Sequence, residues 1–299
     1  MNTTSERPAA GLPQAESSHA DLSLTELMQV NPTNKADVFV AKTETYGPVG
    51  IYGGHFLGQA MAAGLATVEE HKLAHSYHAY FLRAGDPTLP LHYEVTRLRE
   101  SRHGDTRAIT AVQDEHKVFH MIASFKTAES GDEHQPQAPA LEPPEAVIAA
   151  REERDESPFP FPVVQAGRVQ MEWASPSFFE FDRNEPPALR LWMRVAPPST
   201  ALTPRERQIV MAYLSDGPLM FNSVLPHGIP FQSHRLTSLD QSAWFHRDAD
   251  PFQWMIFDQR STAATAGRGM NEGQIYGQDG RLLMTCAQES MLRTILPSN

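Results

Sequence analysis

Two blocks of this chain repeat one order of residues at a constant separation. Arg83 and Arg247 fix the offset at 247 − 83 = 164 positions, which places Ala79-Tyr80-Phe81 on Ala243-Trp244-Phe245. Without a gap, the same offset aligns three further pairs of segments: Asp86-Pro87 with Asp250-Pro251, Asp114–Lys117 with Gln278–Arg281, and Val118–Ala123 with Leu282–Ala287. An ungapped match over a strand, a turn and a strand favours an internal duplication. The chain is therefore expected to fold as two similar units.

The length of 299 residues suits two domains of ordinary size, each able to bury its own core. With 40% hydrophobic and 20% charged residues, the composition is typical of a soluble globular protein. No apolar run reaches the roughly 18 residues of a membrane span, so none is expected. The N-terminus lacks the basic-then-apolar order of a secretory signal, and a cytoplasmic location is expected.

Two segments interrupt the globular pattern. Residues 1–20 are polar and without periodicity, and we expect a disordered tail there. Residues 129–162 are rich in proline and acidic side chains and are predicted to be a linker that contains a short surface helix, Pro144–Glu153. These segments leave residues 21–128 and 163–299 as the two predicted domains.

Each domain shows the same succession of one helix and several extended segments. In the first, Gly53-Gly54 opens a helix predicted over His55–Val68, with small and apolar residues on nearly every face, as in a buried helix. In the second, the helical region is Thr203–Val224. The predicted strands are Ser76–Leu82, Leu91–Leu98, Thr106–Gln113 and Val118–Phe125, then Thr237–His246, Gln253–Gln259, Gly269–Gly277 and Leu282–Arg293. One central helix wrapped by long antiparallel strands, present twice, predicts a tandem α+β architecture.

The net charge of −11 argues against a nucleic-acid-binding protein, because such proteins carry basic faces that neutralise phosphates. The charge neither indicates nor excludes an anionic ligand, which would need a local cluster of Arg, Lys or backbone N–H groups.

Metal binding is not expected. The single cysteine, Cys286, lies in an apolar strand, where a cysteine usually fills space, and it cannot build a metal site alone. His71, His75 and His78 have a spacing that suits metal ligands on a helix. His75 and His78 are predicted on a strand, however, where an odd separation directs side chains to opposite faces.

Several separated motifs, in the right order, resemble the acyl-CoA thioesterase II family. They are Tyr52–Ala60, His75–Asp86, Ser215-Asp216, Leu225–Gly228, Ser238–Arg247 and Ala287–Glu289. The resemblance covers nearly everything except the tail and the linker. It implies a tandem, or double, hotdog fold in which each unit is a long antiparallel sheet wrapped around a central helix. It also implies hydrolysis of fatty acyl-CoA without a cofactor, and assembly into a homodimer or a higher homo-oligomer.

The hydrolytic triad of that family is an Asp, a Ser or Thr, and a Gln, which by motif position correspond to Asp216, Ser238 and Gln288. The resemblance implies that the carboxylate acts as a base on a water held by the other two groups. Taken alone, each residue has a more ordinary role, because an Asp before Gly-Pro usually caps or turns the chain. Shifting the triad by 164 positions leads to Tyr52, Ala74 and Ser124, so one hydrolytic site per chain is expected.

Four residues of the first domain are candidate substrate contacts. Gly53 and Gly54 begin a helix whose backbone N–H groups can face a thioester oxygen or a phosphate, although two glycines more often permit tight packing. His55 is a candidate wall residue of the cleft. Arg83 is predicted either to anchor a turn or to contact CoA. Asp216 is expected at the equivalent helix start of the second domain, so that both helix starts meet in one cleft.

Two other functions stay open. A hotdog enoyl-CoA hydratase would typically need an Asp and His pair beside the thioester, and the matched triad contains no His. A non-hydrolytic acyl-CoA sensor would typically lack a member of the triad, and all three are present.

Overall fold

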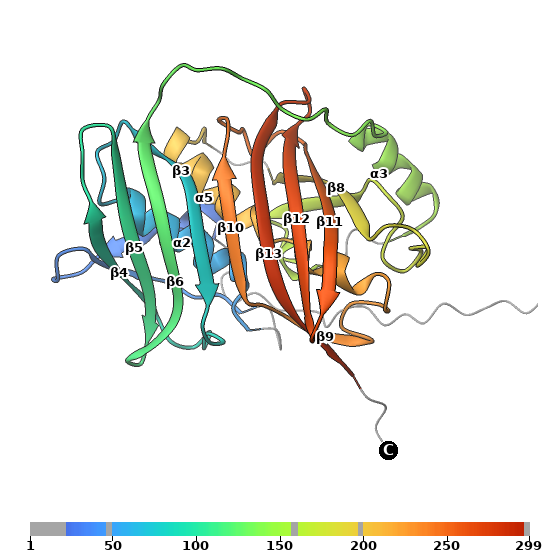
Figure 1. Ribbon diagram of the computed structural model, residues 1–299, viewed down its shortest axis with the longest axis horizontal. Helices are drawn as coiled ribbons and strands as arrows, with labels where there is room; N and C mark the ends of the chain where they lie inside the picture. The colour runs from blue at the N-terminus through green and yellow to red at the C-terminus, as the bar shows by residue number, and fades with distance from the viewer. Residues whose placement is uncertain (1–21, 46–49, 157–160, 197–199, 296–299) are drawn as a thin grey trace, which may run out of the picture.

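The computed structural model describes residues 22–45, 50–156, 161–196 and 200–295, so the predicted tail at 1–20 lies outside the described residues. One continuous antiparallel sheet runs across the molecule (Figure 1). From one edge to the other its path is β1-β2-β4-β5-β6-β3-β10-β13-β12-β11-β8-β7, and β9 pairs with β13 off this path. The predicted α+β double hotdog is thus present as two half-sheets that meet where β3 joins β10.

The strands of the first half are β1 (Val30–Pro32), β2 (Val38–Ala41), β3 (Lys72–Phe81), β4 (Leu91–Arg99), β5 (Gly104–Gln113) and β6 (His116–Thr127). Those of the second half are β7 (Val169–Trp173), β8 (Ala188–Val195), β9 (His234–Ser238), β10 (Asp240–Phe245), β11 (Met255–Thr265), β12 (Arg268–Gly277) and β13 (Leu282–Thr294). The eight predicted strands are all present, although Thr237–His246 is divided at Leu239 between β9 and β10. Sequence analysis missed β1, β2, β7 and β8, which form the two outer edges of the sheet.

The two halves join at equivalent residues. In the antiparallel pairing of β3 with β10, His78 lies opposite Ser242, and these two residues are 164 positions apart. Their side chains also meet, with Nδ1 and Oγ 2.9 Å apart. A local twofold axis between two copies places equivalent residues opposite each other in an antiparallel pair. The structure therefore confirms the duplication.

The offset is not constant to the end of the chain. Ile109 of β5 pairs with Met121 of β6, and the corresponding pair in the second half is Gly273 of β12 with Cys286 of β13. The residues on β5 and β12 are 164 positions apart (273 − 109), whereas those on β6 and β13 are 165 positions apart (286 − 121). Gln288 therefore corresponds to Ala123 rather than to Ser124, a one-residue correction that still leaves the first half without the Gln.

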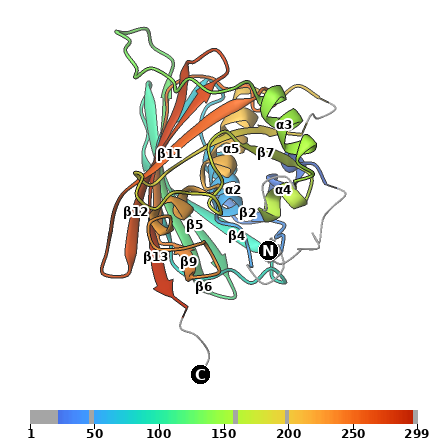
Figure 2. The same cartoon turned by 90° about the vertical axis from the view of Figure 1, so that its right-hand side faces the viewer.

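The two long internal helices lie side by side against one face of the curved sheet (Figure 2). The first, α2 (Gly53–Leu65), is buried along almost its whole length and packs on β5 and β6. The second, α5 (Pro204–Ser215), begins with a capping box between Thr203 and Glu206 and packs along α2. A short helix, α1 (Leu24–Leu27), also contacts α5.

The predicted helical region Thr203–Val224 is not one helix. The α-helix ends at Ser215, and a 3-10 helix, η2 (Leu219–Val224), follows and packs on β11 and β12. The break falls at Gly217-Pro218, because proline has no N–H for the helical ladder and disfavours helical geometry in the residue before it. The turn at this break holds Asp216.

The segment 129–162 includes α3 (Pro144–Glu153), whose bounds agree with the prediction, and the start of α4 (Pro162–Gln165). Val147 and Ile148 of α3 pack against a cluster of buried side chains in the second half. That cluster consists of Trp192, Trp254, Ile256, Tyr276 and Leu282. Within the described residues, no helix has the length and apolar character needed to cross a bilayer.

Candidate active site

Asp216 lies at the C-terminal cap of α5, with φ −76° and ψ −26°. It also directly precedes the turn into η2, which packs on β11 and β12 as α2 packs on β4 and β5. Asp216 therefore keeps the predicted position before the helix equivalent to α2, although that helix is a 3-10 helix that begins at Leu219. Its exposed fraction is 3%, and it sits between the N-terminus of α2 and the inner face of β13. A carboxylate in this position is removed from water and depends on protein donors.

Three groups, from three separate elements, donate hydrogen bonds to this carboxylate. Gln288 Nε2 of β13 donates to Oδ1 at 2.6 Å, and Ser238 Oγ, at the end of β9, donates to the same oxygen at 3.4 Å. The backbone N–H of Gly54 donates to Oδ2 at 3.0 Å. The structure thus brings together the three predicted hydrolytic residues and one of the predicted substrate contacts.

Burial raises the pKa of Asp216 to about 7, although the hydrogen bonds from Gln288, Gly54 and Ser238 oppose the shift. An isolated aspartate titrates at about 3.9. Removing the carboxylate from water disfavours its charged form, while the three donors favour it, and desolvation is the larger effect. A base with a pKa near neutrality can both accept a proton at pH 7 and return it.

The start of α2 requires glycine at positions 53 and 54, because Asp216 and α5 lie too close to leave room for side chains there. A Cβ added at Gly53 would lie 2.6 Å from Asp216 Oδ2, and one added at Gly54 would overlap the carbonyl oxygen of Tyr213. The absence of these side chains lets the helix start approach the carboxylate, and its N–H groups and dipole favour a negative charge there. The helix start therefore faces Asp216 itself.

Ser215, which precedes Asp216, is held by a fully buried hydrogen-bond cluster that sequence analysis missed. Its hydroxyl donates to the carbonyl of Ala212 at 2.8 Å and accepts from Gln241 Nε2 at 3.0 Å. The hydroxyl of Tyr77, in the first half, lies 2.8 Å from the same oxygen and donates to it. Strands from both halves thus anchor the backbone beside the carboxylate. Gln241 is a polar residue at an inward position of β10, two residues before the buried Ala243, and this position is the signal that could have revealed it.

The other two predicted substrate contacts lie apart from the carboxylate. His55 is fully buried on α2, and its Nε2 donates to the carbonyl of Lys42 at 2.9 Å. Arg83 is exposed just beyond the end of β3. Its counterpart Arg247 anchors a turn by donating to the carbonyl of Leu282 at 3.0 Å.

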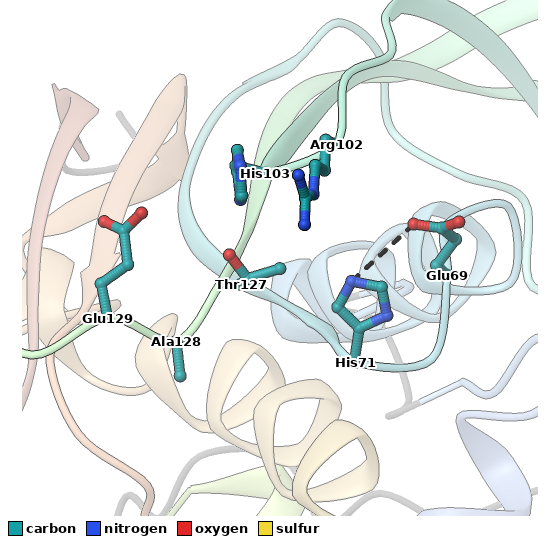
Figure 3. A pocket seen from close by; sticks show the side chains of 7 residues that line it. All are labelled: Glu69, His71, Arg102, His103, Thr127, Ala128 and Glu129. Atoms are coloured by element: carbon teal, nitrogen blue, oxygen red, sulfur yellow. Dashed lines mark ion pairs between the residues drawn. The ribbon is translucent and has the colours of Figure 1, made fainter.

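A separate surface pocket lies at the far end of β3 and β6 (Figure 3). It is lined by Glu69, His71, Arg102, His103, Thr127, Ala128 and Glu129. His71 Nε2 lies 3.8 Å from Glu69 Oε2, and none of the predicted site residues lines this pocket. The donors thus converge on the buried carboxylate of Asp216, and this open depression is a separate feature of the surface.

The three histidines with metal-like spacing have separate neighbours. His71 contacts Glu69, His75 Nε2 lies 2.9 Å from Ser124 Oγ, and His78 contacts Ser242. Among the residues that the structure describes, no three His, Cys, Asp or Glu side chains converge as metal ligands would.

Two family models match this chain in succession. The one described as the acyl-CoA thioesterase N-terminal domain matches residues 42–126, and the one described as the acyl-CoA thioesterase C-terminal domain matches residues 137–292. The C-terminal match alone covers more than half of the chain and includes Asp216, Ser238 and Gln288.

Relatives and solved structures agree with this match. Acyl-coenzyme A thioesterase 8 of Homo sapiens is 31% identical over 90% of this chain and 88% of its own length. Acyl-CoA thioesterase 2 of Haemophilus influenzae is 30% identical over 90% of this chain and 98% of its own length. The crystal structure of the acyl-CoA thioesterase II TesB2 from Mycobacterium marinum matches with a TM-score of 0.76 and 26% identity, over 92% of this chain and 98% of that chain.

Proposed function

This chain belongs to the acyl-CoA thioesterase family, and we propose that Asp216 is the base with which it hydrolyses acyl-CoA. Ser238 and Gln288 hold the attacking water beside the carboxylate. The observation that carries the proposal is the convergence of three donors on one buried aspartate whose pKa is raised to about 7. Such a group is protonated and deprotonated with similar ease at neutral pH.

In the proposed reaction a water oxygen attacks the thioester carbon while Asp216 takes one of the water protons. Gln288 Oε1 has no hydrogen-bond partner within the described residues and accepts the second hydrogen of that water, while the Ser238 hydroxyl orients it. The tetrahedral intermediate then collapses as its carbon–sulfur bond breaks, and the proton on Asp216 passes to the departing thiolate. The products are a carboxylic acid and a free thiol. Holding the water in line supplies several kcal/mol of the rate enhancement.

The test is thiol release from a series of acyl-CoA substrates of increasing chain length. Wild-type protein is expected to release thiol and free acid, and Asp216→Ala is expected to lose about 10²- to 10⁴-fold in kcat. Asp258→Ala is the matched control, because Asp258 is an acid of the same half whose partner is Arg190 on β8, away from the site. Full turnover by Asp216→Ala would contradict the assignment.

Arg83 is proposed as a contact for the phosphate groups of CoA. Its side chain is exposed, and the neighbouring Phe81 lies beside the start of α2, where its ring would be 3.1 Å from a Cβ added at Gly53. Arg83 therefore lies on the solvent side of the α2 start that contacts Asp216. The CoA leaving group, which is large and polar, can remain in water there. Gly53, Gly54 and His55 are proposed to shape the wall of the cleft by packing.

Self-association is proposed through the outer face of β3, β6 and β10. Tyr80 on β3 is 58% exposed, and the large apolar side chains Ile122 and Trp244 lie exposed on the neighbouring strands. This patch surrounds the local twofold axis at His78 and Ser242, and a second copy of the chain can cover it symmetrically. Light scattering of the full chain should give twice the chain mass or more, and Trp244→Arg should lower it.

The division into domains at 21–128 and 163–299, joined through 129–162, is likewise proposed. The two family matches end and begin inside or beside the connecting segment, at residues 126 and 137, which supports it.

A further inference from the structure

The strand that carries Ser238 contains an extra residue where β9 passes into β10. Ser238 lies opposite Ser290 of β13, and Ser242 lies opposite Ala287. Three residues of the β9–β10 segment therefore stand opposite only two residues of β13. Such an extra residue is a β-bulge, which bends a strand and re-aims its side chains. The bulge begins directly after Ser238, beside the proposed hydrolytic site.

The bulge places Ser238 on the inner face of the sheet. Side chains five positions apart on a regular strand point to opposite faces, yet Leu236 of β9 and Gln241 of β10 are both buried. Ser238, two residues after Leu236, shares its face and reaches Asp216, while Gln241 reaches the neighbouring Ser215. A strand without the extra residue would keep Gln241 inside and turn Ser238 to the outer face, away from the carboxylate.

The side chain of Asp240 closes this bulge. Asp240 is half-buried, and its Oδ1 accepts the backbone N–H of Glu289 at 2.9 Å. The carbonyl of Glu289 accepts the N–H of Leu239, also at 2.9 Å. A bulge interrupts the ladder between strands, so a backbone N–H beside it needs another acceptor. Asp240 supplies that acceptor two residues after Ser238, on the β13 residue that follows Gln288.

The first copy of the duplication contains the same bulge without the carboxylate. The pairing of β3 with β6 shifts by one residue between Ala74 and Ser76. The offset of 164 positions places Ala74 on Ser238 (238 − 74) and Ser76 on Asp240 (240 − 76). The bulge is therefore a feature of the fold, whereas the acid within it occurs in the copy that has a hydroxyl at the site.

Ser238 depends on the bulge more than Gln288 does. β13 lies between β10 and β12 (Figure 1), and Gln288 is held from the far side by its pairing with Asn271 of β12. Among the described strands, β9 pairs only with β13, so the position of its last residue, Ser238, depends on the bulge that follows. Ser238 Oγ is 3.4 Å from Asp216 Oδ1, close to the limit of a hydrogen bond, and a small displacement would break the contact.

We propose that Asp240 is a positioning residue for hydrolysis, which holds the bulge through the Glu289 N–H and thereby keeps the Ser238 hydroxyl on Asp216. This inference rests on the proposed function, because Asp240 acts through the hydroxyl that orients the water. The bond to Glu289 needs an acceptor oxygen and no charge, so an amide oxygen in the same place can replace the carboxylate.

The first test compares Asp240→Ala, which removes the acceptor, with Asp240→Asn, which retains one. Asp240→Ala is expected to lower kcat by about 10- to 100-fold with little change in KM, because it displaces a group that aligns the water. Asp240→Asn should keep kcat near the wild-type value. Asp240→Ser gives the second copy the residue that the first copy accommodates at Ser76, and its kcat should also fall. It serves as the test if Asp240→Ala does not fold.

The matched control is Asp250→Ala. Asp250 is an exposed acid beyond the other end of β10, and its Oδ1 accepts the backbone N–H of Phe252 at 3.1 Å. The substitution removes the same kind of bond away from Ser238 and should leave kcat unchanged. An Asp240→Ala variant with wild-type kcat, or an Asp240→Asn variant as slow as Asp240→Ala, would overturn the inference.

A double-mutant cycle separates positioning of Ser238 from a general loss of structure. If Asp240 acts through Ser238, Asp240→Ala should lower kcat by less than about twofold when Ser238→Ala is already present. The same loss in both backgrounds would overturn the inference, because independent defects add in free energy.

A crystal structure of Asp240→Ala tests the geometry without reference to turnover. It should show Ser238 Oγ beyond hydrogen-bonding distance of Asp216 Oδ1, and an unchanged contact would overturn the inference. Absence of thiol release from wild-type protein, with this displacement present in the variant, would instead contradict the proposed function.

Discussion

The backbone N–H of Gly54 donates to Asp216 Oδ2 over 3.0 Å, so a helix start in the first half holds a carboxylate at a helix end in the second. Tyr77, also from the first half, steadies the adjacent Ser215. The candidate site therefore needs both copies of the duplication, although only one copy carries the carboxylate. Neither half is expected to be active alone.

Gly53→Ala should lower kcat by at least tenfold, because the new methyl group would lie 2.6 Å from Asp216 Oδ2 and must displace it. Gly64→Ala is the control in the same helix. Its added Cβ would meet the Phe125 ring at 3.0 Å and the Ile109 side chain at 3.4 Å, and neither residue contacts the carboxylate. Steady-state kinetics and the melting temperature of both variants check this, and equal kcat values would contradict it.

Gln288→Leu should act on both the rate and the pH dependence. It removes the donor 2.6 Å from Asp216 Oδ1, the largest of the contributions that lower the carboxylate pKa. The pKa of Asp216 should therefore rise further, and the midpoint of the pH–rate profile should move to higher pH. Loss of the water contact should reduce kcat by about 10²-fold. A variant with lower kcat but an unmoved midpoint would show that Gln288 does not touch the base.

Asp216→Asn should stabilise the fold more at pH 8 than at pH 4. In the wild type, the pKa of Asp216 is about 7 when folded and returns to an ordinary value of about 3.9 on unfolding. The wild type thus loses stability as pH rises between these values, by up to about 4 kcal/mol, and Asn carries no such charge. Urea unfolding of both proteins at the two pH values measures the difference. An equal difference at both would contradict the buried charge.

Arg83→Ala should raise KM for acyl-CoA several-fold and leave kcat nearly unchanged, as expected for a contact with a non-reacting part of the substrate. Arg247→Ala is the matched control from the second copy. It removes hydrogen bonds to Leu282 and Glu133 and should lower the melting temperature without changing KM. If KM rises only for Arg247→Ala, the proposed CoA contact at Arg83 is wrong.

The repeat and the family motifs were sufficient to predict the double hotdog fold and to choose residues that the fold brings together. The offset of 164 positions between Arg83 and Arg247 recurs at the junction of the two halves, where His78 lies opposite Ser242. Asp216, Ser238 and Gln288 are 22 to 72 positions apart, and only the resemblance linked them.

The local sequence pattern could not predict the remaining features of the site. Gly217-Pro218 divides a helical pattern that otherwise continues, so Asp216 caps the end of α5 and precedes the separate helix η2. The cluster at Ser215 depends on Tyr77, which is 138 positions away, and no local signal links the two.

The most direct test of the account is kcat/KM for thiol release from one acyl-CoA, measured from pH 5 to 9 in wild-type and Asp216→Asn protein. The account predicts that wild-type activity rises through a pKa of about 7, as the buried carboxylate becomes a base. It predicts that the Asn variant is about 10²- to 10⁴-fold slower and lacks that rise. A variant that keeps the wild-type rate, or the same rise through pH 7, would show that the base lies elsewhere.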